Sequence, residues 1–249
     1  MVLGVKIFSG TKTEALKQVV GWISPPSLGL RRGRQKRYIV TPNSEQVVLA
    51  QKDQEFKRIF NQADLALPDG IGLLWAAKGK IKEKISGIDF MEALCQLAGK
   101  HGWRVMLLGG KKDQALKAAR ILSQRYGIEA IHGWQGAIDI RHLSAKGNKI
   151  MLEGVNQFQP DLLFVAYGAP WQEKWLAQNL ARLKIKVGMV VGGSFDMIID
   201  PSLRPPKIME KMRLGWFYRF LRQPWRIKRQ LKLLEFVRLV RLGVWLNAE

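Results

Sequence analysis

Apolar and polar positions follow two different periods along this chain. Short runs that are apolar almost throughout, such as residues 103–110 and 161–168, have the length of strands buried on both faces. Longer segments lie between them. In residues 44–63 the apolar positions recur every three to four residues, which is typical of a helix that buries one face. The alternation predicts an α/β fold with a Rossmann-like, mostly parallel sheet and helices on both faces.

The same pattern gives the expected boundaries of the elements. The helix of residues 11–23 opens with a capping box between Thr11 and Glu14. The other helices are expected at residues 44–63, 72–80, 89–102, 112–127, 148–158 and 172–183. Strands are expected at residues 5–10, 37–43, 64–70, 103–110, 129–134, 161–168 and 186–193.

Glycine ends several of the predicted strands, in the stretches LPDG, LLGG, AYG and VVGG. A glycine in this position lets a ligand approach the backbone closely. Open α/β sheets bind their ligands at the carboxyl ends of the strands. The sequence therefore predicts a binding site along this edge of the sheet.

The regular alternation of strands and helices stops near Phe195. The stretch that follows, DMIIDPSLRPPK, is rich in proline and is typical of a domain boundary. We therefore expect a Rossmann-like domain in residues 1–200 and a C-terminal appendage in residues 201–249.

The composition restricts the class of protein. With 249 residues, of which 47% are hydrophobic, the chain can bury a substantial core. No run approaches the roughly 18 to 20 apolar residues of a spanning helix, and the N-terminus lacks the pattern of a secretory signal. The one cysteine, Cys95, excludes an intramolecular disulfide and fits a reducing compartment. Its apolar helical surroundings indicate a core residue.

The net charge of +21 bears on the partners of the protein and not on its fold. Residues 204–249 contain twelve Lys or Arg and three Glu, and residues 214–236 add a group of aromatic side chains. Nucleic acid, a membrane surface and an anionic substrate each explain such a segment. A second basic stretch, residues 31–37, lies next to Pro and Gly and is typical of a solvated loop.

Several common catalytic signatures are missing. The chain has neither a P-loop nor a Gly-x-Gly-x-x-Gly after a strand, which lowers the odds for a nicotinamide dehydrogenase. The three histidines, His101, His132 and His142, show no metal-ligand spacing. No Asp-x-Asp pair is present to clamp a metal-bound nucleotide diphosphate.

Four polar clusters remain at strand ends, and each also has a purely structural explanation. Thr41 and Asn43 in TPNSEQ stand where a strand gives way to a helix, so Asn43 or Ser44 is also a candidate helix cap. Asp69 in PDGIG is either a turn former or a group that accepts a proton from an attacking hydroxyl.

The other two clusters follow later strands. In GAPWQEKW, Gln172 has the donor and acceptor atoms to orient a sugar hydroxyl, and Glu173 suits the start of a helix. In VGGSFD, Asp196 follows a glycine turn, where a carboxylate either caps a helix or accepts hydrogen bonds from a nucleotide.

Together with three further motifs, these clusters resemble the WecG/TagA/CpsF family of bacterial glycosyltransferases. Each motif alone is weak, but their shared order covers nearly the whole chain. The tail WFYRFLRQPWRIKR is also similar to the end of the family, which has Tyr-Arg, then Pro-x-Arg, then a further Arg. The matching motifs are Thr41-Pro42-Asn43, Asp69-Gly70-Ile71-Gly72, Gly87-Ile88-Asp89, Leu108-Gly109-Gly110, Gly168-Ala169-Pro170-Trp171-Gln172-Glu173, Gly192-Gly193-Ser194-Phe195-Asp196 and Arg204-Pro205-Pro206.

The resemblance implies an inverting transfer of an N-acetylmannosamine-type sugar from a UDP-sugar to N-acetylglucosamine on undecaprenyl diphosphate. It implies a peripheral protein at the cytoplasmic face of the bacterial plasma membrane, acting in the synthesis of teichoic acid or another surface polysaccharide. It also implies a Rossmann-like fold whose C-terminal appendage reaches the membrane, with no metal ion or other cofactor. The oligomeric state is left open, a homo-oligomer included.

The resemblance also assigns roles to single residues. Asp69 corresponds to the proposed catalytic base, and Thr41, Asn43 and Gln172 correspond to polar pocket residues beside it. The expected substrate-binding residues are Asp196, Gly109, Gly110, Gly192, Gly193, Arg219, Arg226 and Arg229. Two stretches depart from the family. In FDMIIDPSLRPP, Asp200 and Pro205 stand where the family usually has other residues, and the region of Trp134 and Gln135 lacks a common aromatic pair.

The basic tail then has two explanations. Its arginines suit the binding of diphosphates, because the planar guanidinium group binds phosphate oxygens in pairs. Its last helix carries an apolar stripe that either lies in a bilayer interface or packs on the core of the protein itself. The residues of this stripe are Leu233, Phe236, Val237, Val240 and Val244.

Two other functions remain as alternatives. The charge and the aromatic residues favour a nucleic-acid-binding protein, but no recognition-helix, RNP or zinc-finger pattern is present. A different nucleotide-sugar or dinucleotide enzyme on a similar sheet is the second alternative.

Overall fold

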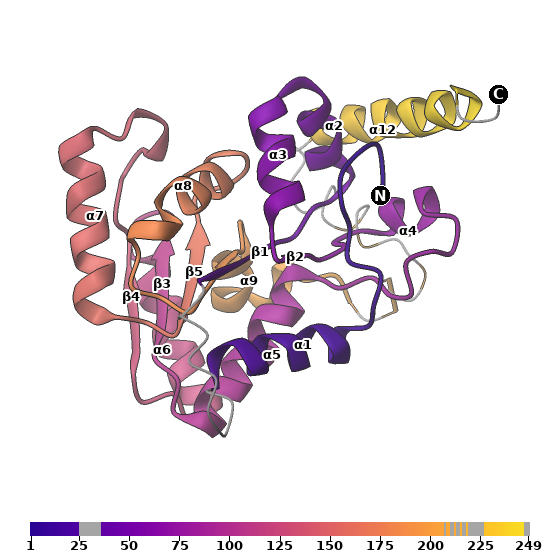
Figure 1. The fold of residues 1–249 in the computed structure, drawn as a ribbon. Helices are drawn as coiled ribbons and strands as arrows, with labels where there is room; N and C mark the ends of the chain where they lie inside the picture. Colours follow the sequence, from indigo (N-terminus) through magenta and orange to yellow (C-terminus); the bar gives the residue numbers. More distant parts are fainter. Residues whose placement is uncertain are drawn as a thin grey trace, which may run out of the picture.

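In the computed structural model, a parallel sheet lies between two layers of helices (Figure 1). The structure describes residues 1–24, 36–206, 208–209, 212, 215, 218 and 227–246, without the side chains of residues 227–231 and 244–246. Within this part of the chain the six strands lie in the order β2-β1-β6-β5-β3-β4. The strands are β1 (Arg37–Val40), β2 (Leu65–Ala66), β3 (Val105–Gly109), β4 (Ile131–Trp134), β5 (Leu162–Ala166) and β6 (Val187–Val190).

The sheet is buried on both faces because successive side chains of each strand enter different cores. In β5, Leu163 and Val165 belong to the core on one face, and Leu162 and Phe164 belong to the core on the other. All of the pairings between the strands are parallel. This arrangement confirms the predicted parallel sheet and explains why its strands are apolar at nearly every position.

Two sets of helices cover the two faces. The first core contains buried residues of α2 (Ser44–Lys52), α3 (Gln54–Gln62), α4 (Ile71–Ala76), α7 (Ala145–Phe158), α8 (Trp171–Asn179) and α12 (Ile227–Leu246). The second contains buried residues of α1 (Lys12–Ile23), α5 (Gly87–His101), α6 (Gln114–Tyr126) and α9 (Ser194–Ile199). Single 3-10 turns lie at η1 (Ile140–His142), η2 (Leu180–Arg182) and η3 (Pro201–Leu203).

The strand expected at residues 5–10 is absent. In this region only an isolated bridge joins Val2 to Val5, across a tight turn in which Leu3 and Gly4 have positive φ. The backbone NH of Lys6 donates to the side chain of Asn61 at 2.7 Å instead of to a neighbouring strand. One backbone bond to β2 is present, from Phe8 N to the carbonyl of Ala66 at 2.8 Å, but it does not continue into the ladder that the apolar pattern suggested.

The long helix expected at residues 44–63 is two helices. Asp53 separates α2 from α3, with extended backbone angles (φ −128°, ψ 97°), and its carboxylate accepts a hydrogen bond from Phe56 N at 3.0 Å. Aspartate favours this position because its short side chain caps the new helix in place of the backbone. Lys174 of α8 contacts the same carboxylate at 2.7 Å and holds the break in place.

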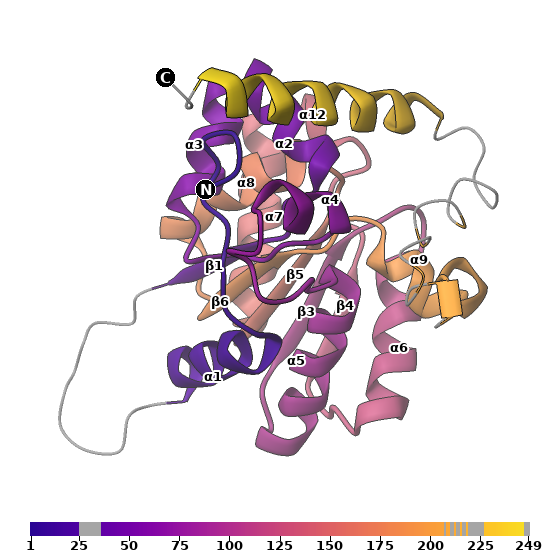
Figure 2. The same ribbon diagram turned by 90° about the vertical axis from the view of Figure 1, so that its right-hand side faces the viewer.

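The C-terminal helix α12 packs against α2 (Figures 1 and 2). Phe236 is fully buried and Val240 nearly so, and both belong to the core that α2 and α3 share. Lys52 of α2 pairs with Glu235 of α12 at 2.8 Å. These two members of the predicted apolar stripe therefore pack on the protein itself, which is the second of the two explanations given above. None of the helices described is both long enough and apolar enough to cross a bilayer.

A Phe236→Ala substitution tests this packing. We expect it to remove about 3–5 kcal/mol from the interaction that holds α12 in place, because a fully buried aromatic ring leaves a cavity. Limited proteolysis should then cut within α12, and urea should unfold the variant at a lower concentration.

Leu234→Ala is the matched control on the same helix. The Leu234 side chain is 69% exposed, so its truncation should change the free energy of unfolding by less than about 0.5 kcal/mol. Equal protease resistance of the two variants would contradict the packing described.

Candidate active site

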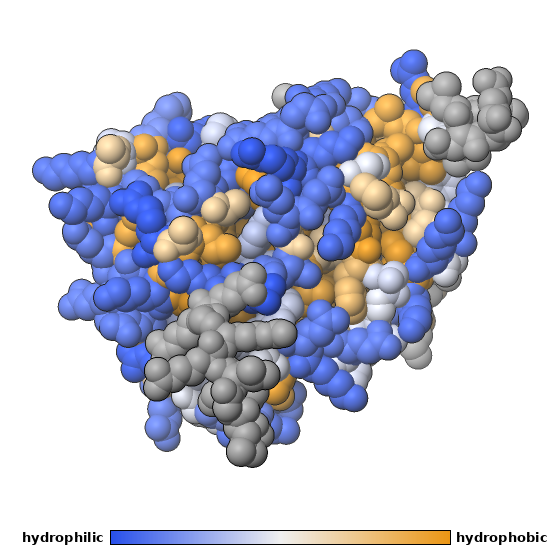
Figure 3. Space-filling view, viewed as in Figure 1, coloured by the Kyte–Doolittle hydropathy of each residue, from blue (hydrophilic) through white to orange (hydrophobic). Residues whose placement is uncertain are grey.

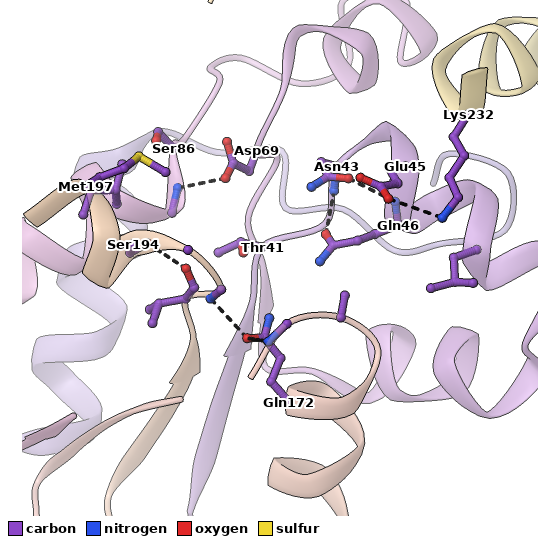
Figure 4. A pocket seen from close by; sticks show the side chains of 18 residues that line it. Thr41, Asn43, Glu45, Gln46, Asp69, Ser86, Gln172, Ser194, Met197 and Lys232 are labelled. Atoms are coloured by element: carbon purple, nitrogen blue, oxygen red, sulfur yellow. Dashed lines mark hydrogen bonds and ion pairs between the residues drawn. The ribbon is translucent and has the colours of Figure 1, made fainter. Parts of the chain in front are cut away.

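A cavity of about 200 Å³ lies where loops after β1, β2, β5 and β6 meet (Figure 4). These loops leave the carboxyl ends of parallel strands, so the sheet brings them to one edge. The lining residues come from these loops and from the helices that follow, with one residue from α12. They include Thr41, Asn43, Glu45, Gln46, Asp69, Ser86, Gly87, Gly168, Gln172, Gly192, Gly193, Ser194, Met197 and Lys232.

The loop after β1 presents Thr41 and Asn43 to the cavity. Thr41 is buried, with 8% of its surface exposed. Asn43 caps α2: its side chain accepts from Gln46 N at 3.0 Å, and its own NH donates to Gln46 Oε1 at 3.1 Å. Asn43 rather than Ser44 is therefore the cap, and the same residue also lines the cavity.

Asp69 follows β2 and is half-buried in the cavity wall. Its carboxylate accepts a hydrogen bond from Gly87 N, at the start of α5, at 3.2 Å. A Cβ at Gly87 would lie 3.2 Å from the Thr41 methyl group and 3.4 Å from Asp69 Oδ2. The missing side chain at Gly87 thus lets the positive end of α5 approach the carboxylate.

Gln172 joins the loops that follow β5 and β6. Its side-chain oxygen accepts from Gly168 N and from Gly192 N, both at 3.1 Å. Its amide nitrogen donates to Glu173 Oε1 at 3.0 Å. With all of these atoms engaged, the amide orientation of Gln172 is fixed, and both glycine loops are held against the cavity.

Glu173 is a carboxylate with no exposed surface, directly behind the cavity wall. In addition to Gln172, its Oε1 accepts from Gln46 Nε2 at 3.3 Å, while its Oε2 has no hydrogen-bond partner. Burial raises the pKa of Glu173 to about 7, against the opposing effect of the hydrogen bond from Gln172. The sequence indicated only a residue suited to a helix start, since a first-turn Glu is usually exposed.

Three further predicted residues lie at the same edge but outside the cavity lining. Asp196 on α9 accepts a hydrogen bond from Gln114 Nε2, and Gln114 Oε1 accepts from Lys111 N at 2.7 Å. Gly109 and Gly110 both have positive φ, and a Cβ at Gly110 would lie 3.1 Å from Gln114. The sequence did not single out Gln114 as a partner of Asp196, because nothing in its local pattern distinguishes it.

The side chains of the predicted tail arginines lie outside the part of the chain that the structure describes. Arg219 and Arg226 lie outside the described residues, and Arg229 lies in α12 with its side chain not described. A cation from α12 that does line the cavity is Lys232, which pairs with Glu45 at 3.3 Å. The sequence pattern had indicated no role for Lys232 in the site.

The stretch that departs from the family pattern forms a compact turn. Asp200 caps η3 by accepting from Ser202 N at 3.0 Å. Arg204 pairs with Glu92 of α5 at 2.7 Å and donates to the carbonyl of Met197 at 3.2 Å. These contacts of Arg204 hold the turn against α5 and α9. Among the described residues, no group of three or more His, Cys, Asp or Glu side chains is placed to hold a metal ion.

Comparison with known proteins agrees with this geometry. The model of the glycosyl transferase WecG/TagA/CpsF family matches residues 1–248. The chain belongs to this family. It is also 32% identical over 199 residues to N-acetylglucosaminyldiphosphoundecaprenol N-acetyl-beta-D-mannosaminyltransferase of Bacillus subtilis (strain 168), which covers 78% of this chain and 75% of that protein. The resemblance found in the sequence is confirmed, and the protein is a glycosyltransferase.

The glycosyltransferase therefore has its polar motifs gathered at one sheet edge. Of the predicted residues, six line the cavity together: Thr41, Asn43, Asp69, Gln172, Gly192 and Gly193. Helices α2, α5 and α8 all begin at this cavity, so their positive ends point toward it.

The raised pKa of Glu173 predicts a pH-dependent stability. Its ordinary value is 4.5 and its folded value is about 7, so the folded protein retains a proton that the unfolded chain has lost between these values. The retained proton stabilises the folded protein by roughly 3 kcal/mol. This stabilisation is fully present below about pH 4.5 and is lost as the pH rises to about 7.

Glu173→Gln removes this titration while keeping a side chain of the same shape. We expect the free energy of unfolding of the native protein, relative to that of the variant, to fall by roughly 3 kcal/mol between pH 4.5 and 7.5. Urea unfolding at several pH values measures this difference. If the difference in free energy of unfolding between the native protein and the variant stays constant over this range, titration of the buried carboxyl group is ruled out.

Proposed function

We propose that this glycosyltransferase moves an N-acetylmannosamine-type sugar from a UDP-sugar to N-acetylglucosamine linked to undecaprenyl diphosphate. The reaction inverts the anomeric centre and serves bacterial surface polysaccharide synthesis. One observation carries the proposal: Asp69 lines the same cavity as Thr41, Asn43 and Gln172, at the edge where parallel sheets bind ligands. The Bacillus subtilis relative, whose name states this sugar and this acceptor, supports the choice of substrates.

In this proposal Asp69 is the general base. The acceptor hydroxyl attacks C1 of the donor sugar from the face opposite the leaving UDP, and the hydroxyl proton passes to the Asp69 carboxylate. The bond between C1 and the UDP oxygen breaks, and the electron pair leaves with UDP. The hydrogen bond from Gly87 N to Asp69 holds the base in one orientation during this step.

The leaving diphosphate gains negative charge, which groups at the cavity can offset. The starts of α2, α5 and α8 supply partial positive charge, and Lys232 supplies a full charge. By resemblance, Arg219, Arg226 and Arg229 complete the site from the tail, and Asp196 with its glycine turns contacts the nucleotide. We therefore propose that the transfer needs no metal ion.

The proposed acceptor also determines where the enzyme works. A sugar on undecaprenyl diphosphate stays in the membrane, so the enzyme must act at the membrane surface. We propose a peripheral protein at the cytoplasmic face of the plasma membrane, with residues 1–200 as catalytic domain and residues 201–249 as membrane-associating appendage. Family membership favours this function over the nucleic-acid-binding and dinucleotide alternatives.

Asp69→Asn tests the base. We expect sugar transfer to fall by about 10²- to 10⁴-fold, because the amide cannot accept the proton, while the thermal stability stays near that of the native protein. The assay combines a panel of UDP-sugars with an N-acetylglucosamine acceptor on a polyprenyl diphosphate and detects the product by mass. The same panel identifies the donor sugar.

Asp113→Asn is the matched control for the change of charge and shape. Asp113 is exposed and has a positive φ of 57°, a conformation that asparagine also tolerates. This variant should transfer sugar at the native rate. Native activity of Asp69→Asn would remove Asp69 from the mechanism.

The metal-free mechanism has its own test. Because helix starts and cations of the chain itself offset the charge of UDP, excess EDTA should leave the rate of transfer unchanged. The measurement compares initial rates before and after chelation. A loss of activity that Mg²⁺ or Mn²⁺ restores would contradict this part of the proposal.

A further inference from the structure

The burial of the apolar stripe of α12 raises the question of which surface meets the membrane. Phe236 and Val240 pack on α2, so they are not available to lipid. The opposite side of α12 carries Leu234, Arg238, Arg241 and Leu242, spaced at i, i+4, i+7 and i+8. All four are exposed, Leu234 to 69% and Leu242 to 48%. This outward stripe of α12 combines two apolar and two cationic side chains along one helix face.

A second group of exposed residues lies on α4 and in the loop after it. Trp75 is 49% exposed near the end of α4, and among the described Trp, Tyr and Phe side chains only it and Trp171 are exposed rather than partly or fully buried. The following sequence, KGKIKEK (residues 78–84), presents exposed Lys78, Lys80 and Lys82. An exposed tryptophan beside a short run of lysines is typical of a surface that binds an anionic bilayer, because the indole prefers the headgroup region.

These two groups share one side of the molecule. Phe236 of α12 packs near Gly72 in α4, where a Cβ would lie 3.4 Å from its ring. Figures 1 and 2 show α4 next to α12, with α7 at the far end of the same layer and α6 on the opposite face of the sheet. In Figure 3 apolar surface gathers over α4 and the C-terminal half of α12, with hydrophilic residues around it.

We propose that this surface, which we term the docking face, binds an anionic lipid bilayer. It comprises Trp75, the lysines of residues 78–82 and the outward stripe of α12. The inference rests on the proposed function, which requires an acceptor held in a membrane. Trp75, Leu234 and Leu242 enter the interface between headgroups and acyl chains, and the lysines and arginines face the lipid phosphates.

The charge on the docking face decides against other occupants. A symmetric dimer through this face would place its cations against their own copies, which is unfavourable. Of the nearby acidic groups, Glu235 is paired with Lys52 and Glu14 with Lys82. Lys78 and Lys80 are therefore the main cations of the loop after α4. A nucleic acid would satisfy the cations but would leave the exposed leucines of α12 without apolar partners.

The docking face adjoins the cavity through the same two elements. Helix α4 begins two residues after Asp69, and α12 contributes Lys232 to the cavity wall. Binding of α4 and α12 to lipid would therefore hold the proposed base beside the membrane that contains the acceptor. The docking face thus extends membrane contact from the appendage to the catalytic domain.

The test compares binding to vesicles of phosphatidylcholine with and without phosphatidylglycerol. We expect Lys78→Glu/Lys80→Glu to weaken co-sedimentation with the anionic vesicles by at least about tenfold. The control, Lys117→Glu/Lys146→Glu, makes the same change of net charge at exposed positions on α6 and α7 and should bind as the native protein does. In a second pair, Trp75→Ala should weaken binding, whereas Trp171→Ala, at a tryptophan with 40% exposure, should not.

Several outcomes would overturn the docking face. It fails if Lys78→Glu/Lys80→Glu binds like the native protein, or if both double variants lose binding equally, because net charge alone would then be responsible. It also fails if the native protein binds short RNA but not anionic vesicles. Circular dichroism and thermal unfolding of each variant exclude loss of the fold as the cause.

Failure of the proposed function is distinguishable from failure of the docking face. On a water-soluble, short-chain acceptor the Lys78→Glu/Lys80→Glu variant should transfer sugar at the native rate, and on an acceptor embedded in vesicles it should be slower. Equal rates on the embedded acceptor would count against the docking face. If the native protein transfers no sugar to either acceptor, the proposed function fails, whatever the vesicle binding shows.

Discussion

The buried carboxyl group of Glu173 is the contact on which the geometry of the cavity depends. Through the amides of Gln172 and Gln46 it connects the glycine loops after β5 and β6 to the asparagine cap of α2. The two glycine loops follow the cap of α2 by more than a hundred residues in the chain. Without a buried acceptor, the two glutamine side chains would lose a shared partner, and their orientations would no longer be fixed. The free-energy cost of burying this carboxyl group is thus offset by the fixed orientation that it gives to the polar side chains of the cavity wall.

Positive charge at the cavity and positive charge on the outer surface come from different groups of the described chain. Among the described side chains that line the cavity, the formal cation is Lys232, and it is paired with Glu45. Partial charges from three helix starts therefore supply much of the positive potential at the cavity. The exposed lysines and arginines described here lie elsewhere, for example on α12 and in the loop after α4. Most of the positive charge on the described side chains therefore lies away from the cavity.

Much of the fold could be predicted from the sequence because local pattern and long-range packing agree. The apolar run of β5 is buried on both faces, and Thr11 and Glu14 form the predicted capping box. The missing strand near Lys6 and the break at Asp53 could not be predicted, because both depend on side chains distant in sequence, Asn61 and Lys174. At the site, strand ends identified the residues of the cavity, but Gln46, Gln114 and the burial of Glu173 follow only from tertiary contacts. The partner of the apolar stripe of α12 was likewise undetermined, since such a stripe suits a bilayer interface as well as the core of the protein.

The strand order has a consequence for how the protein is made. Strand β6 lies between β1 and β5, and its Val187 pairs with Arg37, which leaves the ribosome long before it. Until β6 is synthesised, β1 and β5 each keep an unpaired edge of backbone amides and carbonyls, which other chains can join. The loop after β6 also supplies Gly192 to the cavity, so the cavity is incomplete until this part of the chain has been made. About three-quarters of the chain must therefore be synthesised before these two edges can be paired.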